Sequence, residues 1–290
     1  MSQSEFKLSP KLRLGPVSLK VKDLDSMLSF YERDLGLTVL DRDEAIVQLG
    51  PAKSGKPILV LREIPNAEKP PVDAAGLYHY ALLVPDRRSL AVAYLSLGNA
   101  GIIFDGFADH LVSEALYLTD PEGNGIEIYA DRERGQWKFD EDGHVDMATQ
   151  PLDLDSLLRE VSGLPRDSVK AFVEETRIGH VHLKVTELQR SISFYRTMLG
   201  LDLMRYYGSA AFLSAGGYHH HVGMNTWESL GGKPAKKGWV GLEHLTLAVP
   251  DENLKELSSM LADSPYVAIQ GTGQLFISDP DGIELVLKAS

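Results

Sequence analysis

One pattern of residues occurs four times along the chain, clearly in two copies and more weakly in the other two. This repetition limits the folds that the chain can adopt. The first strong copy contains Val17–Val21, Ser29–Tyr31 and Leu35–Leu37; the second contains Val181–Val185, Ser193–Tyr195 and Leu199–Leu201. Because these runs are spaced alike in the two copies, the chain is built from a duplicated structural unit.

The two weaker copies agree best near their ends. The run Leu116–Gly123 (LYLTDPEG) corresponds to Leu275–Gly282 (LFISDPDG), and a glutamate follows each run, at Glu127 and Glu284. We therefore expect four modules, which cover 12–64, 75–131, 177–226 and 240–288.

Each module is predicted to be a strand, a helix and a meander of strands. In the first module, Val17–Val21 alternates between apolar and polar residues, as in a half-buried strand. Asp23 or Asp25 can cap the following helix, whose apolar stripe ends before Gly36. The predicted fold class is α+β, with four βαβββ modules.

The modules group into two predicted domains. The N-terminal domain covers 1–132 and the C-terminal domain covers 177–290. Between them lies a charged connector, 133–176, with a short helical stretch near Leu152–Val161. We expect the connector to pack on the surface.

Composition excludes several classes of function. The net charge of −12 argues against nucleic acid or an anionic membrane as a partner, because phosphate is bound through excess Lys and Arg. The chain has no cysteine, which removes disulfides and thiolate chemistry and fits a reducing compartment. The first residues are too polar for a signal peptide, and no apolar run reaches membrane-spanning length. We expect a cytoplasmic protein.

Histidines and glutamates fall on the polar faces of the predicted strands. In the third module the alternation places His180 and His182 opposite the apolar face. The second module offers His79 and Glu127, the fourth offers His244 and Glu284, and the first has Pro16 in place of a histidine. Two histidines and one carboxylate on one face suit Fe(II), Mn(II) or Zn(II) and leave coordination positions open.

Two segments carry a resemblance to a known family. The first is defined by the spacing of His110, Leu116–Tyr117, Asp120–Pro121, Gly123 and Glu127. The second is Tyr218–Gly223, in which His220 holds the position of a catalytic histidine. With these motifs the chain resembles the vicinal oxygen chelate superfamily of glyoxalases, bleomycin-resistance proteins and dioxygenases. Within it, the chain is similar to extradiol ring-cleaving enzymes of the catechol 2,3-dioxygenase type.

The resemblance implies two tandem glyoxalase-like domains and an oxidoreductase of aromatic hydrocarbon catabolism. Its substrates would be a catechol-type diol and O2, and its cofactor Fe(II), with Mn(II) as an alternative that shares the ligands. The implied metal ligands are His79, Glu127 and His180. His220 would be the acid–base residue, and Tyr117 and His110 would donate hydrogen bonds to the bound substrate. Whether the chain forms a homo-oligomer is left open.

Alternatives remain for the site and for the function. If the third and fourth modules pair, the ligands are His180, His244 and Glu284, but the tyrosine position then holds Phe276 and the histidine position near 269–271 is empty. We therefore favour pairing of the third module with the second. The alternative functions are a glyoxalase-type metal-dependent lyase or isomerase and a non-catalytic protein that binds aromatic ligands.

Overall fold

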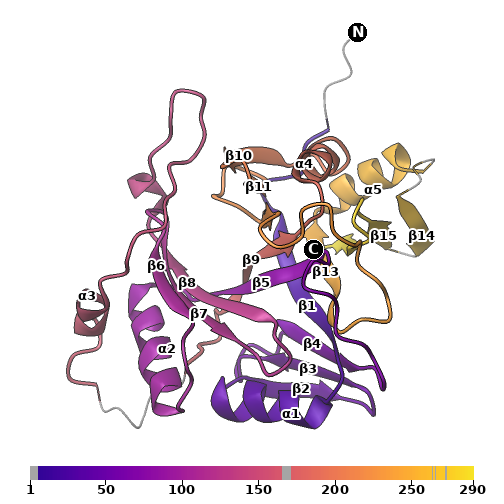
Figure 1. Cartoon of the computed structure of the whole chain (residues 1–290). Helices are drawn as coiled ribbons and strands as arrows, with labels where there is room; N and C mark the ends of the chain where they lie inside the picture. Colours follow the sequence, from indigo (N-terminus) through magenta and orange to yellow (C-terminus); the bar gives the residue numbers. More distant parts are fainter. Residues whose placement is uncertain (1–5, 165–170, 263, 265, 272) are drawn as a thin grey trace. The chain divides into compact units, whose positions relative to one another are not determined.

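The computed structural model describes residues 6–164, 171–262, 264, 266–271 and 273–290 (Figure 1). The first module comprises β1 (Arg13–Val21), α1 (Leu24–Leu28), η1 (Ser29–Asp34), β2 (Thr38–Arg42), β3 (Ile46–Gly50) and β4 (Leu59–Glu63). The second comprises β5 (Gly76–Leu83), α2 (Arg87–Asn99), β6 (Gly106–Asp109), β7 (Ser113–Thr119) and β8 (Gly125–Asp131).

The other two modules repeat this order. The third comprises β9 (Arg177–Lys184), α4 (Leu188–Thr197), β10 (Asp202–Tyr206), β11 (Ala210–Ser214) and β12 (Val222–Asn225). The fourth comprises β13 (Gly241–Val249), α5 (Asp251–Met260), β14 (Val267–Gly271), β15 (Gln274–Ser278) and β16 (Glu284–Ala289). Each module is thus a strand, a helical segment and three strands, which confirms the predicted α+β fold of four βαβββ modules.

The strands form two eight-stranded sheets. Their orders are β14-β15-β16-β13-β1-β4-β3-β2 and β10-β11-β12-β9-β5-β8-β7-β6. The first sheet therefore holds strands of the fourth and first modules, and the second holds strands of the third and second.

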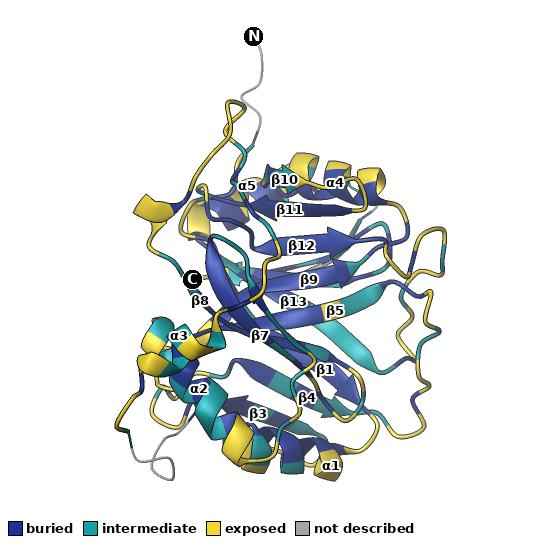
Figure 2. Ribbon diagram, turned by 60° about the vertical axis from the view of Figure 1, so that its left-hand side comes forward, coloured by how far each residue is buried: buried dark blue, intermediate teal, exposed yellow. Residues whose placement is uncertain are grey.

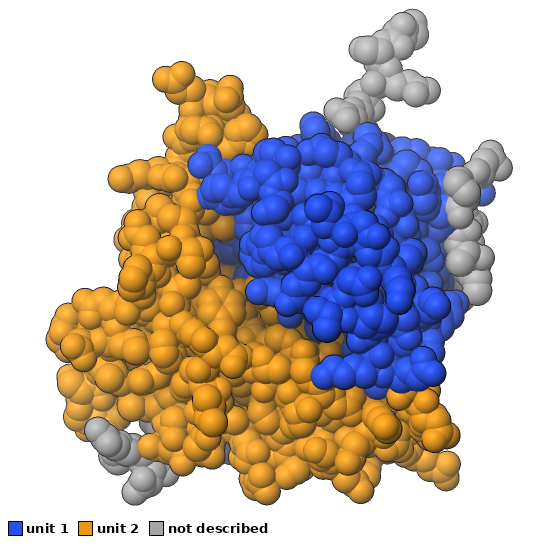
Figure 3. Space-filling view, in the orientation of Figure 1, with its two compact units in different colours: residues 1–18, 68–78, 180–290 blue, residues 19–67, 79–179 orange. Residues whose placement is uncertain are grey.

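The chain also divides into two compact units (Figure 3). Unit 1 contains residues 1–18, 68–78 and 180–290, and unit 2 contains residues 19–67 and 79–179. Strands β1, β5 and β9 each pass through a boundary between these ranges. The predicted domain boundaries at 132 and 177 stay a prediction.

In unit 2, strand β5 pairs in parallel with β8, and β8 pairs with β7 antiparallel. Tyr80 and Leu82 lie opposite Ile126 and Ile128 in register, and all four side chains are fully buried. Most of β7 and β8 is dark blue in Figure 2, whereas the helices carry teal and yellow turns. The apolar alternation of β5 and β8 therefore builds the core, and the other face of these strands carries His79 and Glu127.

The helix of the first module begins as predicted and then continues as a π-helix. The Asp23 side chain caps α1 by accepting a hydrogen bond from the Ser26 N–H at 2.9 Å. In η1 the Leu35 N–H donates to the Phe30 carbonyl, five residues back, at 2.8 Å. Gly36 follows with φ of 87°, a left-handed conformation that ends the helix without a steric cost.

The repeated Tyr and Asp-Pro motifs bond to each other. The Tyr31 hydroxyl donates to Asp120 Oδ2 at 2.7 Å in unit 2, and the Tyr195 hydroxyl donates to Asp279 Oδ2 at 3.2 Å in unit 1. In each case the helix of one module is tied to the Asp-Pro turn of the next. Burial raises the pKa of Asp279 to about 7.

The connector has more structure than the sequence indicated. It contains η2 (Arg134–Gln136) and α3 (Leu154–Arg159), which confirms the expected helical stretch. Its middle packs against the second module, because Gln150 bridges to Asp109 at the end of β6 and Val145 is fully buried. Residues 165–170 of the connector lie outside the described residues.

Among the helices in the described part of the chain, none is both long and apolar enough to cross a membrane.

Candidate active site

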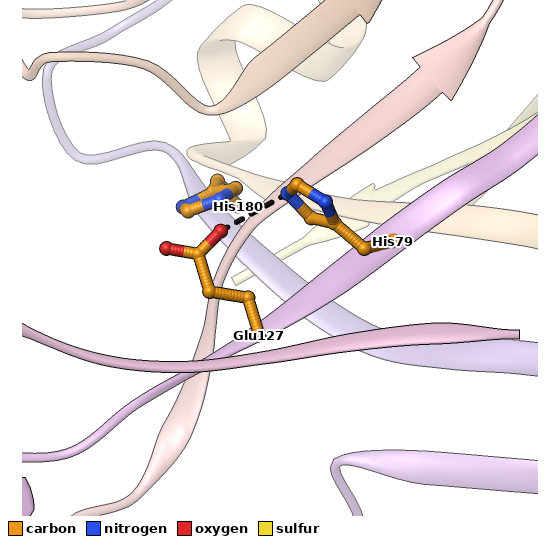
Figure 4. Close-up of side chains that lie close together, drawn as sticks. All are labelled: His79, Glu127 and His180. Carbon is orange, nitrogen blue, oxygen red and sulfur yellow. Dashed lines mark ion pairs between the residues drawn. The ribbon is translucent and has the colours of Figure 1, made fainter. Parts of the chain in front are cut away.

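Two predicted ligands lie side by side on one face of unit 2. In the β5–β8 ladder His79 is opposite Gly125 and Ala81 is opposite Glu127, so that both polar side chains project from the same face. His79 Nε2 lies 3.0 Å from Glu127 Oε2, the dashed contact in Figure 4. Both side chains are buried, and a buried carboxylate requires a compensating positive charge or hydrogen bonds.

The predicted Tyr117 and His110 lie beside this pair. Tyr117 is directly opposite Glu127 in the β7–β8 ladder, and its ring centroid is 5.8 Å from that of His79. The Tyr117 hydroxyl is 2.7 Å from His110 Nε2. Unit 2 therefore brings together the predicted residues His79, Glu127, Tyr117 and His110.

An apolar cluster lies beside these polar groups on the same face of the strands. It consists of Ala81, Leu83, Ala115 and Tyr129, and Tyr117 packs against it. Apolar neighbours of this kind exclude water and strengthen electrostatic interactions nearby.

Unit 1 holds the remaining predicted residues, His180 and His220. The His180 side chain is 2% exposed, and its ring centroid is 4.0 Å from that of His220. His219 Nδ1 and His220 Nδ1 are 2.7 Å apart, so one of these two nitrogens carries the proton and the other accepts. The three rings form one buried group of imidazoles.

His182 is packed among aromatic rings of unit 1. Its ring centroid lies 5.4 Å from Tyr78, 5.6 Å from Trp227 and 5.7 Å from Phe212. Gly223 is opposite His182 in the β9–β12 ladder, and a Cβ there would lie 2.9 Å from His182 Nδ1. The glycine therefore makes room for the imidazole.

The register of the fourth module corrects the expected match between Glu284 and Glu127. Thr119 lies opposite Gly125 in the second module, and Ser278 lies opposite Glu284 in the fourth. Glu284 thus corresponds to Gly125, and Val286 occupies the position of Glu127. The fourth module has no carboxylate at the ligand position.

The alternative ligand set is not assembled in unit 1. His244 Nε2 is 3.0 Å from Ser18 Oγ, and Glu284 Oε1 accepts a hydrogen bond from Ser278 Oγ at 2.9 Å. Among the residues that the structure describes, His180, His244 and Glu284 do not form a group with three neighbouring ligand atoms. The side chains at 269–271 lie outside the described residues.

Three groups that contact or position the site residues were not predicted from the sequence. The Ala148 carbonyl is 2.8 Å from His110 Nδ1, His219 bonds to His220, and Gly179 precedes His180 where a Cβ would meet Tyr129 and Leu83. His219 and Gly179 adjoin the predicted residues His220 and His180, so their place in the sequence could have pointed to them. No sequence signal pointed to a carbonyl of the connector.

Known proteins match this chain over most of its length. The family model described as Glyoxalase/Bleomycin resistance protein/Dioxygenase superfamily matches residues 13–128 and 177–287. The chain is 38% identical over 271 residues to a Bacillus subtilis (strain 168) protein named catechol-2,3-dioxygenase, and the match covers 92% of this chain and 93% of that one.

Solved structures share the fold at low sequence identity. A crystal structure from Bacillus subtilis subsp. subtilis str. 168 matches with a TM-score of 0.62 and 15% identity, covering 98% of this chain and 86% of that one. Glyoxalase I from Zea mays matches with a TM-score of 0.56 and 18% identity, covering 96% and 92%. The extent of the family match and the close relative lead to one conclusion: the chain belongs to the Glyoxalase/Bleomycin resistance protein/Dioxygenase superfamily.

Proposed function

We propose that the chain is an extradiol dioxygenase, which cleaves the ring of a catechol-type diol with O2. The observation that carries this proposal is the buried His79–Glu127 pair with Tyr117 and His110 beside it. It is supported by the 38% identity to a protein named catechol-2,3-dioxygenase over most of both chains.

We further propose that His79, Glu127 and His180 together hold one Fe(II) ion. The three side chains are drawn in Figure 4, and each is buried. Gly179 supports the inclusion of His180, because its backbone lies against Tyr129 and Leu83, which belong to the strands of Glu127 and His79. Two imidazoles and one carboxylate are the donor set of non-haem Fe(II) sites with open positions, and Mn(II) takes the same ligands.

When bound, the metal would supply a Lewis acid that favours the deprotonated diol and a redox centre for the reaction with O2. The chain's own residues would orient the substrate and move its protons. His220 Nδ1 faces His219, so we assign proton exchange with the substrate to His220 Nε2. An imidazole suits this task near neutral pH. The apolar cluster against which Tyr117 packs would exclude water from the aromatic ring of the substrate.

Oxygen uptake tests the proposal. Protein purified without oxygen and loaded with Fe(II) should consume one O2 per catechol and give a yellow ring-opened product. Metal-free protein and Zn(II)-loaded protein are the controls, since Zn(II) has no redox chemistry. Loaded protein that binds iron but consumes no oxygen with any of several catechols contradicts the proposal. Metal-dependent turnover of a glutathione hemithioacetal without oxygen would instead identify the lyase or isomerase.

A further inference from the structure

The middle of the connector lies along the hairpin that carries His110. The Asp109 N–H donates to the Gln150 carbonyl at 2.8 Å, and the Gln150 N–H donates to the Asp109 carbonyl at 2.9 Å. Val145 and Met147 are buried. The segment 145–150 is therefore fixed by backbone hydrogen bonds and by apolar contacts.

This segment places one carbonyl against His110. The Ala148 oxygen is 2.8 Å from His110 Nδ1. A carbonyl oxygen can only accept, so His110 Nδ1 must carry a proton. In the neutral ring Nε2 is then an acceptor, and the Tyr117 hydroxyl, 2.7 Å away, must be the donor.

We propose that the segment 145–150 is a positioning element that sets the direction of the hydrogen bond between Tyr117 and His110. With its proton directed to His110, the Tyr117 hydroxyl can act toward a bound substrate only as an acceptor. This reverses the donor role expected from the resemblance. The proposal rests on the proposed function in one respect, since the group that donates to Tyr117 would be a substrate hydroxyl.

Ion pairs connect Asp109 and the strand β7 to neighbouring elements. Arg132 donates to Asp109 Oδ2 at 2.7 Å and to Glu114 Oε1 at 3.2 Å. Arg87 donates to Glu114 Oε2 at 2.6 Å and to Glu160 Oε1, beyond α3, at 2.9 Å. The buried Glu114 of β7 thus bonds to Arg87 of the helix α2, and Arg87 bonds in turn to Glu160 of the connector.

The tautomer of His110 is the direct test, and it needs neither metal nor substrate. Long-range ¹H–¹⁵N spectra of metal-free, ¹⁵N-histidine-labelled protein at pH 8 separate protonated from unprotonated ring nitrogens, and His110→Gln identifies the signals. We expect a proton on Nδ1 and none on Nε2. Tyr117→Phe should shift the Nε2 signal and leave Nδ1 protonated. A proton on Nε2 in the wild type overturns the proposal whether or not the chain is a dioxygenase.

A pair of proline variants tests the role of the segment. Gln150→Pro removes the N–H donor to Asp109, whereas Glu141→Pro places proline at the second position of the exposed Asp140–Gly143 turn, which proline favours. We expect Gln150→Pro to mix the two tautomers and to lower kcat by about ten- to a hundredfold at unchanged iron content. Glu141→Pro should resemble the wild type.

A single Nδ1-protonated tautomer in folded Gln150→Pro would show that the segment does not set it, and would overturn the positioning role. If Gln150→Pro does not fold, Ala148→Pro is the second variant, since it removes only the longer 3.4 Å bond from the Ala148 N–H to the His110 carbonyl. If His110 stays protonated on Nδ1 in Ala148→Pro while the Ala148 carbonyl is displaced, the positioning role is likewise overturned.

Discussion

Glu127 and Glu284 follow similar Asp-Pro turns, yet their carboxylates occupy different places in their ladders. Glu127 is opposite Tyr117, whereas Glu284 is opposite Ser278 and accepts its hydrogen bond. We predict that Glu127→Ala abolishes iron binding and that Glu284→Ala retains it, because only the first removes a proposed ligand and its negative charge. Elemental analysis of both variants after iron loading measures this.

The two substitutions are matched in chemistry and control for each other. Iron retained by Glu127→Ala and lost from Glu284→Ala would place the metal in the fourth module and contradict the ligand assignment.

His220 packs against His180 but is not a proposed ligand. We predict that His220→Ala keeps its iron and its affinity for substrate while kcat falls by about 10²- to 10⁴-fold, the usual contribution of an acid–base group. Single-turnover kinetics and iron analysis measure the two effects. His144→Ala, in the half-exposed turn of the connector, is the control. Loss of iron from His220→Ala would reassign His220 to the ligands.

Sequence alternation was enough to place His79 and Glu127 on one face, because side chains in strands point alternately to opposite faces. It could not fix the register of Glu284. If Glu127 and Glu284 were equivalent, the second module would have an insertion at Asn124–Gly125. The ladders show no insertion, because Ser278 pairs with Glu284 in the same way that Thr119 pairs with Gly125. Register is set by strand pairing, which the local pattern around a single glutamate does not contain.

At the scale of elements, the start of β9 depends on a residue with no side chain. A Cβ on Gly179 would lie 2.7 Å from Tyr129 Cζ and 2.9 Å from Leu83 Cβ. We predict that Gly179→Ala displaces this end of β9, costs about 1 to 3 kcal/mol of stability, and weakens iron binding through His180. Denaturant unfolding and iron titration measure the two effects.

Gly98→Ala in α2 is the matched control. Apart from its chain neighbours and the backbone of its own helix, no atom of the described residues lies within 4 Å of a Cβ at this exposed position. Alanine should therefore stabilise the protein by up to about 1 kcal/mol. An unchanged iron affinity in Gly179→Ala would show that the close approach does not position His180.

The strands and helices of the modules followed from periodicity and from caps such as Asp23. The course of the connector did not. Its register on the β6–β7 hairpin is set by backbone hydrogen bonds at Asp109 and Gln150, which any residue type can make. Such a contact leaves no mark in composition or in apolar spacing.

At the scale of the whole molecule, Asp279 links stability to pH. Its pKa rises from 3.8 to about 7 because of burial, with a further contribution from the charge of Asp281. The native state therefore holds this proton at pH values where the unfolded chain has released it. Stability should fall as pH rises from about 4 to 7 and then level off, with a loss of up to about 4 kcal/mol.

We predict that Asp279→Asn, which cannot ionise, gains stability relative to the wild type as pH rises from 5 to 8. Its amide oxygen can still accept from the N–H groups of Asp281 and Ile283. Urea unfolding of both proteins across this range gives the difference. Asp142→Asn in the exposed turn is the control, and curves for Asp279→Asn that run parallel to the wild type would contradict the prediction.

The bond between a helix tyrosine and the next module's Asp-Pro turn occurs twice, as Tyr31 with Asp120 and as Tyr195 with Asp279. In both cases it joins an odd-numbered module to the even-numbered module that follows. This is the arrangement expected if the chain arose by copying a two-module ancestor that already had this bond. Recombination should accordingly exchange halves of the chain more readily than single modules, because a lone module would leave a buried aspartate without its tyrosine.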